Sequence, residues 1–340
     1  MTNQKNTEKI KEFHLFAGIG GGIYGGELLG HECCGGVEIL PYAQKVLKQR
    51  QEDGWMNEFP IYGDICSLNG NDFKGKFDVL CGGFPCQAFS TAAHGKNIAE
   101  KNLWNEMLRF AVESDAPVVF GENVVLRAIE KAKADLERVG YRVERCRLSC
   151  SDIGADHQRN RFWLLAVKDD KTLKRLYNHS LTLPKLTGFC WTEKPLSLSK
   201  NDGEEKNRRM QLLGVGNAQS PLVAATAFRI LLNRHFCQEK KQSEIVTDEE
   251  ISNVFTKEKT WIQKTFNNIG LVHTPTTMAN YSCPSMMKHQ GCRNFKEVFG
   301  RPEPVNAEYL MGFPIGASNP SAMNIDNYKK WYSYDDNRND

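Results

Sequence analysis

The sequence lacks several patterns that would have placed it in a class at once. None of its 11 cysteines belongs to a CxxC pair, so we expect neither a zinc site nor a redox dithiol. Scattered free thiols are typical of a reducing compartment. No apolar run approaches the ~20 residues of a membrane-spanning helix. Residues Met1–Lys11 are polar and charged, unlike a signal peptide, so we expect a cytoplasmic protein with no membrane segment.

Internal repeats and strong charge are missing as well. No repeat at solenoid spacing is visible, which excludes a repeat array. The net charge of +3 permits a nucleic-acid partner without establishing one. What the chain does have is length: 340 residues with 40% hydrophobic content allow two domains, or one domain with a large insertion.

The first regular feature is a strand, a glycine-rich turn and a helix. The strand ends at Phe16, the turn is Gly18–Gly21, and a helix is predicted over 23–29. The glycines permit a tight turn and a close approach of a cofactor. The next strand ends at Glu38, and 38 − 18 = 20 residues separate it from Gly18, the offset that places an acid on a ribose hydroxyl. Alone, such a turn is a weak signal.

A cysteine follows the next buried strand. Phe77–Cys81 is apolar, Gly82-Gly83 allows a sharp turn, and Pro85 excludes helix just before Cys86. A cysteine on a stiff loop at the carboxyl end of a strand is placed as a nucleophile would be. A lone cysteine is more often a small buried side chain, so the neighbouring motifs must decide.

The rest of the chain is read from its periodicity. Asp64 ends a third strand and is either a turn residue or a partner of a bound nucleobase. We expect a loop-rich insertion over 169–207, a charged linker over 239–259 and disorder after Asn319. Strands are predicted at 117–120, 141–148 and 161–167, and helices at 41–50, 101–113, 126–139 and 222–232, the last one buried.

Taken together, these stretches resemble the bacterial or phage type of the DNA (cytosine-5)-methyltransferase family. The glycine turn resembles its S-adenosylmethionine loop, and Gly83–Gln87 resembles its nucleophile motif. Glu122–Val124 matches its Glu-Asn-Val motif, and Arg159 and Arg161 match the arginines of its Gln-x-Arg-x-Arg motif. Gly216-Asn217 matches its late Gly-Asn motif. These five motifs occur in the same order as in the family, and together they strongly indicate membership of it.

The resemblance implies an α/β fold: a Rossmann-like S-adenosylmethionine-dependent sheet with helices on both faces, plus a smaller irregular target-recognition region. The implied catalytic and cofactor-binding domain covers 11–168, and the closing motif with its helix covers 208–234. Target recognition is expected chiefly over 235–325, with the insertion at 169–207 as a candidate part of it.

The resemblance also implies roles for single residues. Cys86 would add to carbon 6 of a flipped cytosine, and Glu122 would hydrogen-bond the ring. Arg159 would hold its exocyclic oxygen, and Arg161 would brace either Glu122 or the loop. The implied cofactor contacts are Phe16, Gly18, Ile19, Gly20, Gly21, Glu38, Ile39, Asp64, Ile65, Phe84, Pro85, Leu103 and Asn217. The implied DNA contacts are Gln87, Ser90, Lys96 and Lys101.

The chain departs from the family pattern at several positions. His14 stands where an acid is usual, which would weaken or reroute a contact to the methionine part of the cofactor. The family's Pro-Gln falls on Asp156-His157, and Gln219 stands where a small or branched residue is usual. Met311–Pro314 resembles a piece normally found before the Gly-Asn motif, as in a rearranged layout.

Double-stranded DNA is the implied partner of an expected monomer, with a cognate restriction endonuclease as a candidate second partner. A tRNA cytosine-5 methyltransferase is the first alternative, because related motifs serve RNA. An inactive nucleic-acid-binding homologue is the second, although the intact Cys86, Glu122 and Arg159 argue against it. A nicotinamide dehydrogenase is a distant third, suggested only by the glycine turn and Glu38.

Overall fold

The computed structural model describes residues 9–85, 103–187, 205–237, 243–256, 272, 299 and 303–332. The predicted nucleophile and DNA contacts lie outside the described residues: Cys86, Gln87, Ser90, Lys96 and Lys101.

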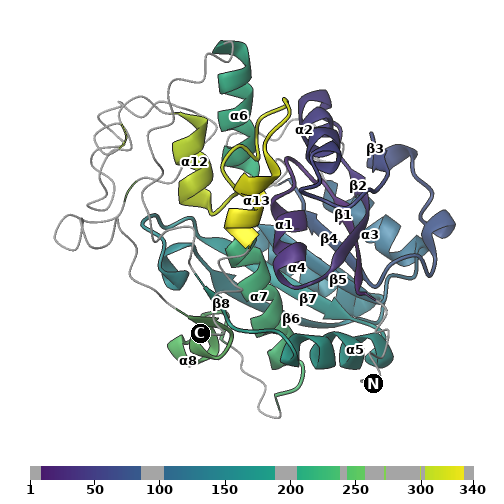
Figure 1. Cartoon of the computed structure of the whole chain (residues 1–340). Helices are drawn as coiled ribbons and strands as arrows, with labels where there is room; N and C mark the ends of the chain where they lie inside the picture. Colours follow the sequence, from purple (N-terminus) through teal and green to yellow (C-terminus); the bar gives the residue numbers. More distant parts are fainter. Residues whose placement is uncertain are drawn as a thin grey trace, which may run out of the picture.

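Seven strands form one mixed sheet in the order β3-β2-β1-β4-β5-β7-β6 (Figure 1). The parallel strands are β1 (Lys11–Leu15), β2 (Glu32–Val37), β3 (Ile61–Tyr62), β4 (Val79–Gly83) and β5 (Val118–Asn123). The antiparallel edge consists of β7 (Arg161–Val167), which pairs with both β5 and β6 (Arg142–Leu148). The strand order reverses between β1 and β4, where open α/β sheets leave a crevice at the carboxyl ends of their strands.

Helices cover both faces of this sheet, so the predicted α/β class is confirmed (Figure 1). One face packs against α1 (Gly21–Leu28), α2 (Pro41–Glu52) and α7 (Pro221–Arg234), and the other against α3 (Leu103–Glu113) and α4 (Leu126–Arg138). Successive side chains of a strand alternate between faces. Val79 therefore joins the first core and Leu80 the second.

The helix α7 is buried almost all round, as its apolar composition predicts. In the described part of the chain, no helix is both long and apolar enough to cross a bilayer.

The expectation of a loop-rich insertion over 169–207 is wrong for its first part. Helix α5 (Asp170–Leu181) begins where the Asp169 side chain accepts hydrogen bonds from the amides of Lys171 and Thr172. Its narrow apolar face, with Leu173 and Leu176, is buried in the core beneath α7. A short strand, β8 (Leu186–Thr187), follows this helix.

The described parts of 235–325 pack on the catalytic domain, and their assignment to target recognition stays a prediction. Helix α8 (Asp248–Val254) is fixed to α7 by the Glu250–Arg234 ion pair at 2.8 Å. Strand β9 (Phe255–Thr256) pairs in parallel with β8.

The end of the described chain is ordered, which corrects the expectation of disorder after Asn319. Helices α12 (Pro304–Met311) and α13 (Ile325–Tyr332) lie beside α6 (Glu205–Asn217) and α1, far from them in sequence (Figure 1). Trp331 packs edge-on against Tyr24 of α1, with ring centroids 5.6 Å apart. The fully buried Arg50 of α2 donates to the carbonyls of Gly316 and Ser321. This segment therefore completes the core.

Candidate active site

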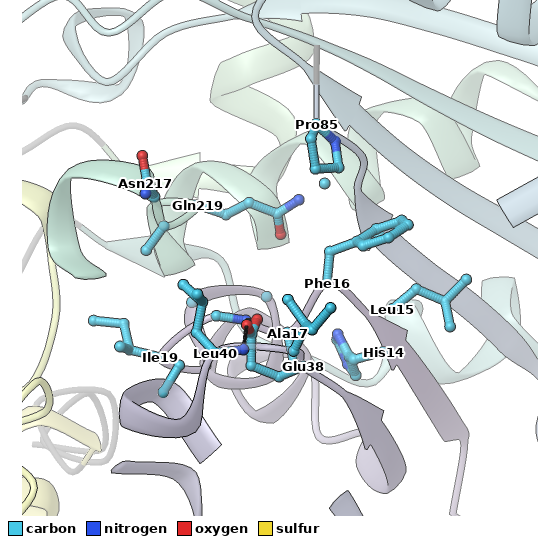
Figure 2. A pocket seen from close by; sticks show the side chains of 18 of the residues that line it. His14, Leu15, Phe16, Ala17, Ile19, Glu38, Leu40, Pro85, Asn217 and Gln219 are labelled. Atoms are coloured by element: carbon cyan, nitrogen blue, oxygen red, sulfur yellow. Dashed lines mark hydrogen bonds between the residues drawn. The ribbon is translucent and has the colours of Figure 1, made fainter. Parts of the chain in front are cut away.

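A cavity of about 550 Å³ opens at the carboxyl ends of β1, β2, β4 and β5. Its walls come from the turns after these strands and from α6 and the residues that follow it. Figure 2 shows side chains from β1, from the segment after β2 and from the end of α6 around the same space. Parallel strands bring residues that are distant in sequence to one edge of the sheet.

The glycine turn gives the cavity its floor. Phe16, directly after β1, adopts a left-handed backbone with φ 55°, which is rare for a bulky residue and indicates local strain. Gly18 follows with φ 56°, and a Cβ there would meet open space. Gly21 is needed for a different reason, since its Cβ would lie 2.2 Å from the carbonyl oxygen of Gln219. The turn and the segment after α6 are thus in backbone contact.

Gly20 has a different position from the one predicted for it. It is absent from the cavity lining, and it precedes α1 with φ 93°. A Cβ at this position would meet the Met56 side chain at 2.5 Å. Gly20 therefore starts the helix and packs inward, and its contact with the cofactor stays a prediction.

Glu38 closes the turn from the neighbouring strand. One carboxylate oxygen accepts a hydrogen bond from the amide of Gly18, and the other accepts from the amide of Leu40, both at 2.7 Å. The 20-residue spacing noted in the sequence is therefore a real contact. Each carboxylate oxygen has a further acceptor site, so a hydroxyl group in the cavity can still be bound.

The wall beyond Glu38 is mainly apolar. Ile39 is 65% exposed and borders the opening, whereas Ile65 is buried in the second core. The Asp64 side chain accepts from the amide of Cys66 at 2.9 Å, so it caps the short helix Ile65–Ser67. The turn interpretation of Asp64 is confirmed, and a nucleobase contact stays a prediction.

Asn123 fixes the chain just before the predicted nucleophile. Its side-chain amide donates to the carbonyl of Phe84 at 2.8 Å, and its oxygen accepts from the amide of Val125 at 2.9 Å. The ring of Phe84 is buried against Trp104, with centroids 4.9 Å apart. The motif Glu-Asn-Val therefore has a structural component: β5 anchors the end of β4.

Glu122 at the end of β5 is one of the acidic groups of the cavity, and it is only 8% exposed. Arg161 at the start of β7 lies opposite it, with Nε 3.1 Å from the Glu122 carboxylate, so the predicted ion pair is present. Gln219 donates a further hydrogen bond to the same carboxylate. Burial raises the pKa of Glu122, and Arg161, Arg159 and Gln219 only partly offset that effect. A proton is therefore held at this site to a higher pH than on a free glutamate.

Arg159 is placed differently from Arg161. It has φ 45°, so the chain is not extended here and the two arginines do not alternate as they would on a strand. Its Nη2 donates to the carbonyls of Gly216 and Ala218, at 2.9 and 2.6 Å. Burial and the charge of Arg161 lower the pKa of Arg159 to about 9, so it stays cationic at neutral pH. Arg161 lines the cavity, whereas Arg159 holds the end of α6.

His157 lies buried behind these arginines. Within the described part of the chain, neither ring nitrogen has a hydrogen-bond partner. Burial and the charges of Arg159 and Arg161 lower the pKa of His157 to about 3, so the ring is neutral at pH 7. The position was noted in the sequence only as a departure from the family's Pro-Gln.

The cavity brings together nearly all the described residues that were predicted to contact the cofactor. These are Phe16, Gly18, Ile19, Gly21, Glu38, Ile39, Asp64, Ile65, Phe84, Pro85, Leu103 and Asn217. Sequence reasoning missed His14 and Gln219 as lining residues, although it had noted both as departures from the family pattern. It also missed Met210 and Leu213, whose spacing with Asn217 is that of one helix face.

Comparisons with known proteins agree with this arrangement. The model of the C-5 cytosine-specific DNA methylase family matches residues 10–313. Type II methyltransferase M.CviJI of Paramecium bursaria Chlorella virus IL3A is 30% identical over 212 residues, covering 60% of this chain and 55% of that protein. Type II methyltransferase M.HhaI of Haemophilus parahaemolyticus is 30% identical over 179 residues, covering 50% and 53%. The chain thus spans about half the length of these relatives.

A solved structure of a prophage-encoded Escherichia coli protein, described as a DNA modification methyltransferase, aligns with 96% of this chain and 99% of its own. The sequence identity is 16% and the TM-score is 0.45.

Proposed function

The chain belongs to the family of C-5 cytosine-specific DNA methylases, and we propose that it transfers a methyl group from S-adenosylmethionine to carbon 5 of cytosine in DNA. The observation that carries the proposal is the arrangement around Glu122. This buried carboxyl group, held by Arg161 and Gln219, lies in one cavity with the glycine turn and Glu38. This arrangement supports the proposal because a carboxyl group suited to hold a base lies next to a cavity suited to hold a nucleotide-type cofactor.

The residues present fit the proposed cofactor. Glu38 offers acceptors for ribose hydroxyls, the exposed Ile39 and the ring of Phe16 offer apolar surface for an adenine, and the cavity volume suits a ligand of this size. When bound, S-adenosylmethionine supplies an electrophilic methyl group. It would have to lie with that group toward Pro85 and Glu122, the end from which the base arrives.

The base must leave the duplex to reach this cavity. The thiolate of Cys86 then adds to carbon 6, forming a carbon–sulfur bond and making carbon 5 nucleophilic. Glu122, with its raised pKa, can give a hydrogen bond or proton to ring nitrogen 3 as negative charge builds there. The methyl group would pass to carbon 5 and leave the cofactor as the thioether S-adenosylhomocysteine. A water molecule would then take the carbon 5 proton, so that the double bond re-forms, the carbon–sulfur bond breaks and Cys86 is released as a thiolate.

Arg161 and Arg159 then have different proposed roles, which the sequence did not indicate. Arg161 lies in the cavity beside Glu122, so it is the better candidate for contact with the exocyclic oxygen of the base. Arg159, with Nη2 on two backbone carbonyls, would keep the end of α6 and Gln219 in place.

A methylation assay with purified protein tests the proposal. Labelled methyl transfer to double-stranded DNA, single-stranded DNA and tRNA would be measured with wild-type protein and with the Cys86→Ala variant. Transfer to double-stranded DNA alone, absent in the variant, supports the proposal. Transfer to tRNA alone would replace it with the RNA alternative, and transfer by the variant would reject Cys86 as the nucleophile.

A further inference from the structure

A buried row of ionisable side chains runs under the cavity floor, and the proposed mechanism does not use it. Glu12 of β1 is 3% exposed and lies between two histidines. Its Oε2 is 2.8 Å from Nε2 of His14, and its Oε1 is 2.6 Å from Nδ1 of His31. Gly26 of α1 makes room for this carboxylate, because a Cβ there would lie 2.2 Å from Oε2.

The charge state of this row follows from its contacts. Burial alone would raise the pKa of Glu12, but His31 and His14 outweigh burial and lower it to about 2. An ionised carboxylate can only accept hydrogen bonds, so Nε2 of His14 and Nδ1 of His31 must be the donors. When the proton of the His14 ring sits on Nε2 alone, the remaining nitrogen, Nδ1, is an acceptor.

That acceptor lies at the cavity. His14 belongs to its lining, and a Cβ placed on Gly22 would be 3.3 Å from Nδ1 of His14 and 2.7 Å from Oε1 of Gln219. The amide nitrogen of Gln219 is turned toward Glu122, so its oxygen faces this side. Nδ1 of His14 and Oε1 of Gln219 therefore lie near the first turn of α1, and Figure 2 shows both side chains at the cavity. The Glu12 carboxylate lies behind the His14 ring.

Cys81 is a further polar neighbour of the row. Its sulfur and the ligand atoms of Glu12 and His14 lie within 4.8 Å of one another, close enough for a metal ion. Burial raises the pKa of the Cys81 thiol well above its ordinary value, so the thiol stays protonated when no metal ion is bound. The hydrogen bonds of Glu12 to both histidines point instead to a relay that orients the His14 ring.

We propose that His14 is a specificity-determining residue of the cofactor site: its Nδ1 accepts a hydrogen bond from the ammonium group of the methionine moiety, while Glu12 holds the ring in the accepting tautomer. The inference rests on the proposed function, because it needs a donor with an amino-acid tail. Adenine and ribose would occupy the Ile39 and Glu38 side, which leaves the His14 side for this tail. A buried anion near a cationic ligand also strengthens its binding.

The test uses ligands that differ only in the tail. Affinities of the full chain for S-adenosylmethionine and for 5′-methylthioadenosine, which has no amino-acid tail, would be measured by calorimetry. His14→Phe keeps the ring shape but removes the acceptor. It should weaken S-adenosylmethionine binding about 10- to 100-fold, the usual range for a hydrogen bond to a charged group, and leave 5′-methylthioadenosine binding within about twofold.

Two further variants separate the relay from simple packing. Glu12→Gln removes the buried charge and should show the same selective loss, whereas His14→Asn restores an acceptor and should recover part of the affinity. His179→Asn is the matched control, because His179 contacts His31 from outside and binds the carbonyl of Leu29. It should leave both affinities unchanged.

The outcomes are distinguishable. Equal losses for the two ligands in His14→Phe, or no loss for either, would overturn the role of His14 and leave the proposed function standing. If wild-type protein bound neither ligand, the cofactor itself would be rejected, and the proposed function with it.

Discussion

The side-chain amide of Asn123 on β5 holds the carbonyl oxygen of Phe84 at 2.8 Å, two residues before Cys86. This contact joins the Glu-Asn-Val motif to the nucleophile motif across 39 residues of sequence. The two motifs are therefore one structural unit, and Glu122 and Asn123 have separate tasks within it. The Glu122 side chain is directed to the cavity, and the Asn123 side chain holds the chain at Phe84, just before the nucleophile motif ends at Cys86 and Gln87.

Asn123→Ala tests that division of tasks. It removes a buried donor and leaves the carbonyl of Phe84 unpaired, which should lower the free energy of unfolding by about 1–3 kcal/mol. Methyl transfer should fall because the loop is no longer anchored. Asn123→Asp is the matched variant: it keeps the acceptor for Val125 and loses only the donor to Phe84. Urea unfolding with stability unchanged in both variants would contradict this role.

Glu122→Gln should reduce methyl transfer by about 10²–10⁴-fold, the usual contribution of a positioned acid, and leave cofactor affinity unchanged. Because burial raises the pKa of Glu122, its protonated form persists to higher pH and is lost as the pH rises through that pKa. The wild-type rate should therefore fall on the alkaline side, and the variant should lack this decrease. Single-turnover rates across pH measure both effects. If the rate of Glu122→Gln also decreased at alkaline pH, the titrating group would be one other than Glu122.

Gln219→Leu removes a hydrogen bond that lowers the pKa of Glu122. The pKa should rise further, so the alkaline decrease in rate should move to higher pH, with an overall loss of about tenfold. The matched Asn217→Ala variant changes a neighbouring lining residue that has no contact with Glu122 among the described residues, and its profile should keep the wild-type midpoint. Identical midpoints in wild type and Gln219→Leu would exclude the Gln219–Glu122 coupling.

Glu12→Gln should change the acid stability of the protein. A folded-state pKa of about 2 against an ordinary 4.5 means that folding favours the ionised form. This contribution, about 3 kcal/mol, is fully present above pH 4.5 and is lost as the pH falls toward 2. Urea midpoints should therefore differ most between wild type and variant at neutral pH and converge in acid. A gap that stayed constant with pH would mean that Glu12 is not an ionised, paired carboxylate.

Gly21→Ala and Gly18→Ala form a matched pair in one turn. A Cβ at Gly21 meets the Gln219 carbonyl oxygen at 2.2 Å, so the turn and the segment after α6 must separate, at a cost of about 1–3 kcal/mol. A Cβ at Gly18 meets open space and costs about 1 kcal/mol for its left-handed backbone. Thermal unfolding should rank Gly21→Ala as the less stable. The reverse order would show that backbone conformation outweighs that contact.

Much of the cavity could be predicted because the residues that line it belong to short, recognisable stretches of sequence. Each predicted strand ends in a distinctive residue or turn, and the topology of a parallel sheet brings those ends together without further information. Gly18 and Glu38 are a clear case, since their 20-residue spacing is a direct hydrogen bond in the structure.

The parts that could not be predicted depend on contacts between distant residues. The apolar residues of α5 form only a narrow face, and the contact with α7 that buries them is not visible in the sequence. Trp331 lies in a polar stretch of sequence, and its contact with Tyr24 of α1 is known only from the structure. The two arginines differ for a local reason, because the backbone turns at Arg159 with φ 45°. Arginine itself rarely adopts such a left-handed backbone, so its residue type did not signal the turn.

The most direct test of the central claim is base-resolution sequencing of 5-methylcytosine in DNA from cells that express this protein, beside cells that express Cys86→Ala. The account predicts methylation confined to a short recurring sequence and absent with the variant. Unmodified DNA in the presence of abundant folded wild-type protein would contradict it, and so would equal methylation with both proteins.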